Sequence, residues 1–405
     1  MIHYMTADGI ASPWNANELR RVQLAGIPFT LNALRKPTDF SHEAGWAQEM
    51  NDDTVSIYPL APLRLAASLF LAPILFRGRY FSALFNALFG RRESLKVRFA
   101  ALVHFFVAAY WALSLRNDKP DHIHSQWAHS GGTVAMYGAW LLNVPFSFTG
   151  HAVDLFRQRV ALQDKIERAD FIVCISNFHR QFYLDQGASP DKLIIVYCGL
   201  DLTLFKPVKK SRAEDVFTIL SAGRLIEKKG FHHLIDACGL LRDRGLDFKC
   251  VIGGSGPQEA DLRRLIADRK LDNTVTLTGE ALKQERIPEF MASGDVFCLP
   301  CVWARDNDVD GLPQLLMEAM ACGRPVISTR LVGIPDLVIN QETGLLVEPG
   351  NTGELADALQ FAIQNEAQMN AFVLKGLELL QSRFNLETCL EPLFDKYRSR
   401  SDVHS

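Results

Sequence analysis

The sequence has no surplus of positive charge. Its 43 Lys and Arg residues are outnumbered by 46 Asp and Glu residues, which gives a formal net charge of −3. Proteins whose main role is to bind nucleic acid usually present a strongly basic domain or surface. The charge balance therefore argues against nucleic acid as the principal partner.

The sequence also lacks the cysteine pattern of a zinc site or a redox centre. Cys298-Leu-Pro-Cys301 has suitable spacing, but a structural zinc site needs a second pair, and a redox pair places its first cysteine at a helix start. Here the pair ends an apolar strand, and no second pair follows. We expect the 8 cysteines to be reduced residues of a cytoplasmic protein, mostly within its core.

A cleavable signal peptide is likewise not expected, because residues 1–9 have the pattern of a short strand that runs into a turn. What the sequence does contain is an alternation of apolar strands and amphipathic helices over 405 residues, which is too long for one ordinary core. The alternation predicts an α/β fold with two domains, at residues 1–200 and 208–380. Residues 381–405 would contribute a last helix that crosses back to the first domain.

A loop with fixed cations follows the first strand of the second domain, residues 217–222. Its sequence is Gly223-Arg224-Leu-Ile-Glu-Lys228-Lys229-Gly230. Cations at the carboxyl end of a strand suit a diphosphate, because Arg can bind it with two hydrogen bonds and Lys as a point charge. The alternative is a solvated basic turn, which the glycine at each end of the loop makes the weaker interpretation.

A glycine cluster follows the next strand. Gly253, Gly254 and Gly256 would permit close approach of the backbone to a ribose or a phosphate. Their spacing is not the dinucleotide fingerprint, and no acidic residue follows at the distance expected for a ribose ligand. NAD and FAD are therefore disfavoured as cofactors.

The stretch 310–318 places a carboxylate on each side of a predicted helix start. Pro313 suits the first turn, so that Asp310 lies just ahead of the helix and Glu318 lies about two turns inside it. Such an arrangement can hold an anion on free N–H groups and a sugar hydroxyl on a carboxylate. The same residues also fit an acid/base pair, or a buried helix with two acids and no ligand.

In the first half, an apolar strand delivers His151, with Asp154 three residues later, to a strand-to-helix junction. Ligands in open α/β sheets bind at the carboxyl ends of strands, so we expect His151 to line a ligand site. The loop at 122–129 contains three histidines, which strand alternation would keep from converging on a metal, and it is also expected to line a ligand. Gly9 follows the first strand, although its spacing alone favours a plain turn.

Residues 60–98 combine basic and large apolar residues. Only one acid, Glu93, accompanies seven basic residues, which are Arg64, Arg77, Arg79, Arg91, Arg92, Lys96 and Arg98. Basic residues interleaved with Phe and Leu predict peripheral contact with an anionic membrane, here the inner face of the cytoplasmic membrane. The apolar run at 99–115 is short for a span, so it favours a buried core helix over a transmembrane one.

Taken together, these motifs resemble the retaining glycosyltransferases of family 4. That family has the GT-B fold, in which two Rossmann-like parallel-sheet domains face each other across a cleft. The resemblance runs through residues 223–230, 253–257, 310–326, 148–151 and 196–201. It is strong from about residue 145 to residue 350 and weak over the first 120 residues.

The resemblance implies a nucleotide-diphosphate-sugar donor on the second domain, bound without a metal ion. Arg224 and Lys229 would neutralise the diphosphate and stabilise the leaving group, which is the compensation a metal would otherwise supply. Glu318 would bind the ribose hydroxyls, and Asp310 would lie near the donor sugar. Further donor contacts would come from Gly254, Gly256, Gly311, Leu312 and Pro313.

On the first domain, the resemblance implies that His151 lines the reacting sugar and that Gly9 lies on the acceptor-side loop. The chain departs from the family in two places. Asp310 stands where the family usually has Glu, which shortens the reach of the carboxylate by one methylene. The loop that contains Gly9 lacks the double glycine that is common in the family.

The predicted activity is the transfer of a sugar, with retention, from a UDP- or GDP-sugar to a lipid-linked or polysaccharide acceptor in cell-surface glycan synthesis. One alternative is another GT-B enzyme, such as a sugar-nucleotide epimerase or a phosphorylase. An epimerase should carry more acid/base groups, and a phosphorylase should carry a cofactor lysine motif, neither of which the sequence contains. The other alternative is a non-catalytic nucleotide-sugar-binding protein, which would tolerate loss of the cations that are present at Arg224 and Lys229.

Overall fold

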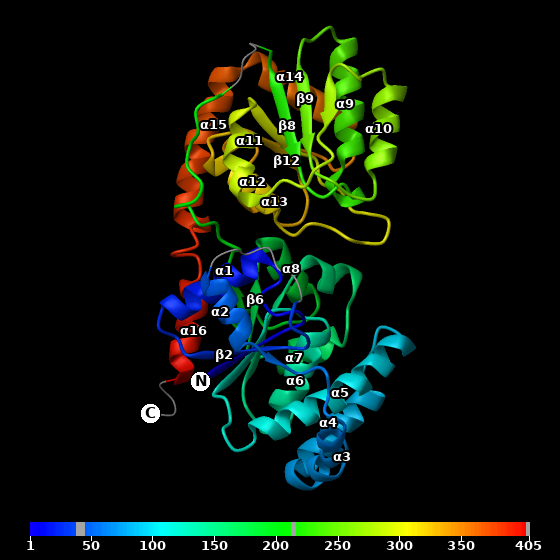
Figure 1. The fold of residues 1–405 in the computed structure, drawn as a ribbon, viewed down its shortest axis with the longest axis vertical. Coiled ribbons are helices and arrows are strands. Elements are labelled where there is room, and N and C mark those ends of the chain that lie inside the picture. The colour runs from blue at the N-terminus through cyan, green and yellow to red at the C-terminus, as the bar shows by residue number, and fades with distance from the viewer. Residues whose placement is uncertain (38–44, 212–215, 402–405) are drawn as a thin grey trace. The chain divides into compact units, whose positions relative to one another are not determined.

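A computed structural model describes residues 1–37, 45–211 and 216–401 (Figure 1). The chain forms two compact units, of which the first comprises Met1–Cys198 together with the segment that begins at Cys389, and the second comprises Gly199–Thr388. Residues 402–405 of the predicted closing segment lie outside the described residues. Each unit is built on its own parallel sheet.

The first unit contains a seven-stranded parallel sheet with the order β3-β2-β1-β4-β5-β6-β7. Ile2 of the inner strand β1 lies opposite Phe29 of β2 and His122 of β4. All the strands run in the same direction, so their carboxyl ends meet at one edge, where loops can form a ligand site. The strands are β1 (Ile2–Thr6), β2 (Phe29–Ala33), β3 (Val55–Ser56), β4 (His122–Ser125), β5 (Phe146–Gly150), β6 (Phe171–Cys174) and β7 (Leu193–Ile195).

Helices pack against this sheet. Helix α1 begins at Pro13, because proline is favoured in a first helical turn. Within the predicted closing segment, residues 381–405, the helix begins at Glu391, and it contributes Tyr397, whose hydroxyl donates to the Tyr4 hydroxyl at 2.7 Å. The helices are α1 (Pro13–Leu24), α2 (Gly45–Asp53), α6 (Ser130–Leu142), α7 (Leu162–Arg168), α8 (Asn177–Asp185) and α16 (Glu391–Ser401).

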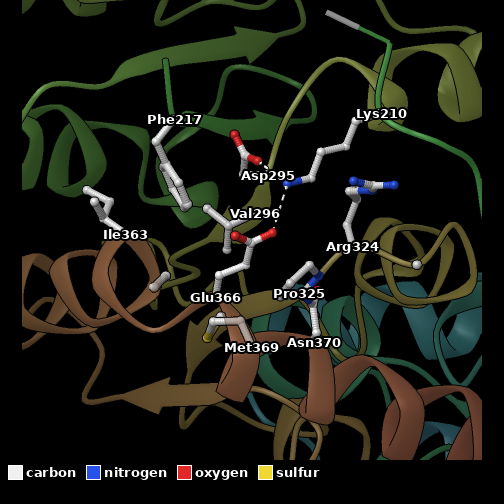
Figure 2. Close-up of a pocket in the computed structure, with 12 residues that line it drawn as sticks. Lys210, Phe217, Asp295, Val296, Arg324, Pro325, Ile363, Glu366, Met369 and Asn370 are labelled. Carbon is white, nitrogen blue, oxygen red and sulfur yellow. Dashed lines mark ion pairs between the residues drawn. The ribbon is translucent and has the colours of Figure 1, made fainter. Parts of the chain in front are cut away.

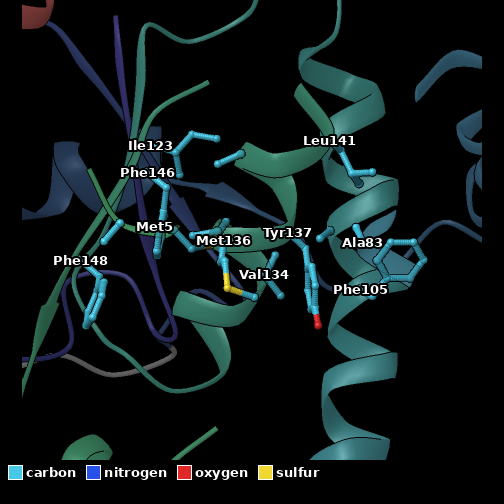
Figure 3. Packing of buried hydrophobic residues seen from close by; sticks show 14 of the residues in the cluster. Met5, Ala83, Phe105, Ile123, Val134, Met136, Tyr137, Leu141, Phe146 and Phe148 are labelled. Atoms are coloured by element: carbon cyan, nitrogen blue, oxygen red, sulfur yellow. The ribbon is translucent and has the colours of Figure 1, made fainter. Parts of the chain in front are cut away.

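Three further helices form a layer beyond α6, and they are α3 (Pro62–Phe76), α4 (Gly78–Phe89) and α5 (Leu95–Leu115) (Figure 1). The core runs from Phe146 of the sheet through Val134 of α6 to Phe105 of α5 (Figure 3). By length and composition α5 could cross a membrane, and 39% of its apolar window is buried, but core helices of soluble proteins pass the same test. Phe105, Ala108 and Trp111 of α5 are buried in the core that includes α6, whereas Leu95 and Phe99 are exposed.

A buried ion pair fastens this helical layer to the rest of the unit. The Arg92 side chain is 0% exposed, and its Nη1 lies 2.6 Å from Asp164 Oδ2 of α7. Its Nη2 donates to the Tyr137 hydroxyl at 2.9 Å and to the side chain and backbone of Asn86. Glu93 accepts the N–H groups of Ala161 and Leu162 at the start of α7. Within the predicted lipid-facing segment, Arg92 is therefore a structural residue that does not face lipid.

The second unit contains a six-stranded parallel sheet with the order β10-β9-β8-β11-β12-β13. The strands are β8 (Thr218–Ala222), β9 (Lys249–Gly253), β10 (Val275–Leu277), β11 (Val296–Leu299), β12 (Val326–Thr329) and β13 (Leu345–Val347). The helices are α9 (Phe231–Asp243), α10 (Glu259–Asp268), α11 (Ile287–Ala292), α12 (Gln314–Ala321), α13 (Ile334–Leu337), α14 (Thr352–Gln364) and α15 (Glu366–Leu379). The loops after β8, β9 and β11, together with α12, carry the residues predicted to bind the donor, and these loops lie at the carboxyl edge of the sheet.

Candidate active site

The loop after β8 presents its cations at the carboxyl edge of the second sheet. Arg224 is exposed, whereas Lys228 and Lys229 are partly buried in a 3-10 turn that ends at Gly230. Gly230 has a φ of +69°, and a Cβ there would lie 1.9 Å from the carbonyl oxygen of Pro300. Only glycine allows the loop to close against the end of β11, which places the lysines beside the loop that contains Asp310.

Asp310 binds both lysines. Lys229 Nζ lies 2.6 Å from Asp310 Oδ2, and Lys228 Nζ lies 3.1 Å from Oδ1 of Asp310 and from Oδ1 of Asp308. Burial alone would raise the pKa of Asp310, but the two ammonium groups outweigh it and hold this pKa below its ordinary value. Burial would lower the pKa of Lys229, but Asp310 reverses that effect and the pKa is raised. The Asp310 carboxylate and the Lys229 ammonium are therefore both charged at neutral pH.

Arg224 is the cation of the loop that remains available to a ligand. It is exposed and forms no ion pair with any residue in the described part of the chain. Lys229, in contrast, already faces a carboxylate. A diphosphate that entered this site would meet Arg224 directly, and it would have to share Lys229 with Asp310.

The predicted glycine cluster supports the loop after β8. A Cβ at Gly254 would lie 2.0 Å from the carbonyl oxygen of Gly223, and a Cβ at Gly256 would lie 2.7 Å from the backbone of Leu225. The loops after β8 and β9 therefore touch backbone to backbone, which requires glycine at both positions. This contact gives the two glycines a structural role that the sequence analysis did not anticipate, since it assigned them to the ligand alone.

The start of α12 offers unpaired donors. Helix α12 begins at Gln314, directly after its N-cap residue Pro313. Within the described residues the N–H groups of Gly311 and Leu312 donate to no protein acceptor, while the carbonyl oxygen of Gly311 accepts the Gly333 N–H at 2.8 Å. The loop that carries Asp310 thus presents free N–H groups close to the Lys229 ammonium, as an anion site requires.

Glu318 lies on the same helix and is 4% exposed. Burial raises its pKa to about 7, while a hydrogen bond with Gln284 acts in the opposite direction. No described cation forms an ion pair with this carboxylate. A buried carboxylate that lacks a cationic partner is costly, and hydroxyl donors from a ligand would satisfy it.

The raised pKa of Glu318 predicts a pH-dependent stability. The folded protein holds this proton more tightly than the unfolded chain does, so the contribution of Glu318 is complete below about pH 4.5 and is lost as the pH rises through 7. We expect Glu318→Gln to gain stability over the native protein between pH 5 and pH 8, by about 2 to 3 kcal/mol. Calorimetric unfolding of both proteins at several pH values measures the difference in their free energies of unfolding. If the free energy of unfolding changed with pH in the same way in both proteins, the raised pKa of Glu318 would be contradicted.

In the first unit, His151 lies between two tryptophans at the carboxyl end of β5. The ring centroids of Trp14 and Trp127 are 4.3 Å and 4.6 Å from that of His151. Burial lowers the pKa of His151 to about 3, with His179 and His129 adding to the effect, so the imidazole is neutral. Its Nε2 is buried and has no hydrogen-bond partner among the described residues. A neutral imidazole with a free nitrogen suits contact with a sugar hydroxyl.

Asp154 shapes the loop that carries His151. Its carboxylate accepts the N–H groups of Ala128 and His151, the latter at 2.7 Å. Burial raises the pKa of Asp154 to about 7, and these backbone donors oppose the rise. Asp154 therefore ties the loop after β5 to the loop after β4. His122 and His124, which were expected to line a ligand, instead bond to the buried Ser147 within the sheet, at 2.6 Å and 2.8 Å.

A buried polar group near Gly9 was missed by the sequence analysis. The Gly9 N–H donates to Thr6 Oγ1 at 2.8 Å, and its carbonyl oxygen accepts from Asn15 Nδ2 at 2.8 Å. Glu18, on the same helix as Asn15, accepts from Gln126 at 3.1 Å and has a pKa raised by burial to about 7. The signal in the sequence was a polar residue at each of two helix positions that face the sheet, 15 and 18, where apolar residues are the rule.

A cavity of about 280 Å³ in the second unit lies at the opposite edge of its sheet (Figure 2). Phe217, Asp295 and Pro325 line it, and they lie at or just before the amino ends of their strands. Lys210 lies 2.6 Å from Asp295 and 3.6 Å from Glu366. These charges compensate one another, and the cavity is separate from the predicted donor residues.

Two protein-family models match consecutive parts of the chain. The family described as Glycosyl transferases group 1 matches residues 205–377, and the one described as Glycosyltransferase Family 4 matches residues 58–204. Together the two matches run from the helical layer of the first unit through most of the second. The chain belongs to glycosyltransferase family 4.

Relatives within this group include proteins of several bacteria. The amylovoran biosynthesis glycosyltransferase AmsK of Erwinia amylovora is 32% identical over 241 residues, which cover 58% of this chain and 59% of that protein. A GDP-mannose-dependent alpha-(1-6)-phosphatidylinositol monomannoside mannosyltransferase of Mycobacterium tuberculosis is 29% identical over 238 residues, which cover 56% of this chain and 62% of that protein. The matches thus span about three fifths of the length of these relatives.

Solved structures share the fold of this family 4 chain. Anabaena Alr3699/HepE in complex with UDP has a TM-score of 0.71 at 16% identity and covers 98% of this chain and 99% of that one. The apo form of the lipopolysaccharide outer core galactosyltransferase WaaB has a TM-score of 0.67 at 15% identity and covers 98% and 100%. These likenesses confirm the predicted GT-B fold class of two parallel-sheet α/β domains.

Proposed function

We propose that the chain is a retaining glycosyltransferase that transfers a sugar from a UDP- or GDP-sugar to a glycan acceptor in cell-surface glycan synthesis. One observation carries the proposal: Arg224, Lys229, Asp310, the free N–H groups of Gly311 and Leu312, and Glu318 belong to adjoining elements at one sheet edge. That edge is where open α/β sheets bind ligands. The Anabaena relative binds UDP, and the Mycobacterium relative uses GDP-mannose, so both nucleobases are considered.

In the proposed reaction, Arg224 and Lys229 bind the diphosphate, and the N–H groups of Gly311 and Leu312 meet the β-phosphate or the sugar. Glu318 accepts from the ribose hydroxyls. The bond between the anomeric carbon and the β-phosphate oxygen breaks, and the acceptor oxygen forms a bond on the same face of the sugar. The acceptor proton passes to the departing phosphate oxygen. Charge on this phosphate is compensated by the protein, so we propose a metal-independent reaction.

Asp310 would hold Lys229 in place and approach the donor sugar once the diphosphate shares that lysine. His151 of the first unit would contact a hydroxyl of the reacting sugar through its free Nε2. Its pKa of about 3 means that it acts as a neutral hydrogen-bonding group at physiological pH. The Gly9 loop would contribute to the acceptor side.

Binding of nucleotide sugars tests the proposal. UDP-, GDP- and ADP-sugars are added to the protein in the presence of EDTA, and the unfolding temperature is measured. We expect stabilisation by a UDP- or GDP-sugar, since a ligand that binds only the folded state stabilises it. Stabilisation by none of them would remove the donor-site assignment. A strict requirement for a divalent ion would contradict the metal-independent mechanism, and binding without hydrolysis or transfer would favour a non-catalytic protein.

We also propose that the helical layer contacts an anionic membrane at its cytoplasmic face. Large apolar side chains project from α3, α4 and α5, among them Phe70 at 75%, Phe85 at 65% and Leu95 at 84% exposure. Arg64 of α3 and Lys96 of α5 are exposed, and so is Arg77 between α3 and α4. An apolar face rimmed by cations fits the boundary between lipid head groups and acyl chains.

Replacing two exposed phenylalanines of α4 should weaken membrane binding. We expect the double variant Phe85→Ser, Phe89→Ser to lower affinity for phosphatidylglycerol-containing vesicles at least tenfold, because each buried phenyl ring contributes about 2 kcal/mol. Co-sedimentation with vesicles measures the change. Leu374→Ser provides the control, since Leu374 is 66% exposed in the second unit. Equal binding of both variants, or self-association through this face in place of vesicle binding, would contradict the proposal.

A further inference from the structure

A second cavity lies in the first unit, at the carboxyl edge of its sheet. Its volume is about 390 Å³, within the range of small-ligand sites. Its lining includes Ala7 after β1, Arg35 after β2, Tyr58 after β3 and Ser130 at the start of α6. Four adjacent strand ends therefore contribute to it. His104 of α5 completes the wall, so the cavity joins the sheet to the helical layer.

The lining offers hydrogen-bond donors and positive charge. The Arg35 guanidinium lies over the Tyr58 ring, 5.4 Å from its centroid. His104 Nδ1 is buried without a hydrogen-bond partner in the described chain, and the His129 ring stacks on Trp127 at 5.3 Å. None of the described residues that line the cavity carries a carboxylate. A ligand with several negatively charged oxygens fits such a wall.

The start of α6 adds further hydrogen-bond donors beside the cavity. Within the described chain, the N–H groups of Ser130, Gly131 and Gly132 donate to no protein acceptor. Burial lowers the pKa of His104 and of His129 to about 4, and the nearby Lys165 ammonium acts in the same direction on both. Both imidazoles are therefore neutral at physiological pH and can act as N–H donors. A phosphate or a diphosphate is the ligand that this combination favours.

Helix α5 connects the cavity to the exposed apolar face. Leu95, Phe99 and Val103 recur every four residues and are 84%, 69% and 40% exposed, so they form one stripe along the helix. Phe105 points into the core (Figure 3). His104 lies between Val103 and Phe105 in the sequence, and it reaches the cavity beside the end of the stripe. A ligand with its phosphate in the cavity can therefore lay an apolar chain along α5.

We propose that this cavity binds the phosphate or diphosphate group of a lipid-linked acceptor, with Arg35, His104 and His129 as its contacts. The inference rests on the proposed glycosyltransferase activity and specifies the class of its acceptor. The lipid chain occupies the stripe of Leu95, Phe99 and Val103 and continues into the membrane that the helical layer contacts. The sugar attached to the phosphate then extends over the carboxyl edge of the sheet.

Farnesyl diphosphate is a soluble probe for this site. Binding is measured by equilibrium dialysis in an Arg224→Ala background, which removes the exposed cation of the donor site and so weakens diphosphate binding there. We expect Arg35→Gln and His104→Gln each to raise Kd about tenfold, because each removes a hydrogen bond to a charged group. Arg116→Gln, at the exposed far end of α5, should leave Kd unchanged. Unchanged binding in both cavity variants would overturn the proposal.

Inorganic pyrophosphate serves to distinguish a site for a lipid-linked diphosphate from a site for a free diphosphate. A lipid-linked acceptor requires farnesyl diphosphate to bind at least tenfold more tightly than pyrophosphate, since burial of its apolar chain adds free energy. Equal affinities would overturn the lipid assignment. Arg35 is exposed, so Arg35→Gln should fold even where His104→Gln does not. Stabilisation of Arg35→Gln by nucleotide sugars is measured in parallel, so that failure of the acceptor site is distinguished from failure of the donor site.

Discussion

Arg224→Ala is expected to lower kcat/KM for sugar transfer by about 10² to 10³, which corresponds to about 3 to 4 kcal/mol of transition-state stabilisation. In the proposed reaction, negative charge develops on the β-phosphate as its bond to the sugar breaks. Arg224 is the exposed cation of the loop after β8, and Lys229 is already shared with Asp310. Loss of Arg224 thus leaves the departing phosphate with Lys229, whose positive charge is partly compensated by Asp310.

The stability of this variant should not change, because Arg224 is exposed and has no ion pair with a described residue. Arg305→Ala is the matched control. Its side chain is 95% exposed and lies 3.4 Å from Glu227, in the turn that precedes the lysines. Turnover by Arg305→Ala should remain within about twofold of the native rate. Full turnover by Arg224→Ala would remove the diphosphate role of this residue.

Arg92→Met is expected to destabilise the first unit by about 3 to 5 kcal/mol. The substitution leaves Asp164, 9% exposed in its side chain, without its cation at 2.6 Å. It also deprives the Tyr137 hydroxyl and the Asn86 carbonyl of a donor. Urea unfolding followed by tryptophan fluorescence reports mainly on this unit, because all of the 6 tryptophans except Trp303 belong to it.

Arg91→Met provides the control for this prediction, since the neighbouring arginine is exposed. Arg91→Met should change the free energy of unfolding by no more than about 0.5 kcal/mol. A loss of similar size in both variants would mean that the Arg92 pair does not hold the helical layer. A double-mutant cycle with Asp164→Asn separates the pair from the remaining hydrogen bonds of Arg92.

The fold was predictable because local patterns and tertiary packing agree. The apolar stretch at 217–222 forms β8 over Thr218–Ala222, and the amphipathic stretch after Gly230 forms α9 over Phe231–Asp243. Buried parallel strands read as short apolar runs, and glycines mark where the chain turns at their carboxyl ends. The same logic placed Arg224, Lys229 and Asp310 at one edge of a sheet.

Side-chain partners over long distances were not predictable in this way. Arg92 counted as one of several basic residues in a lipid-facing segment, yet it meets Asp164, 72 positions further along the chain. Composition gives the number of charges in a segment, but the direction of each side chain depends on packing. Glu18 was missed for the same reason, since its partner Gln126 follows β4 and is 108 positions away in the sequence.

The last helix also affects how the protein is made. Tyr397 of α16 is fully buried and bonds to Tyr4 of β1, so the first unit needs residues from both ends of the described chain. The second unit, Gly199–Thr388, is a continuous segment and can fold as soon as it has left the ribosome. The first unit begins synthesis earlier but cannot cover β1 until α16 has been translated. We expect the part of the first unit that is already translated to need protection from aggregation during that interval.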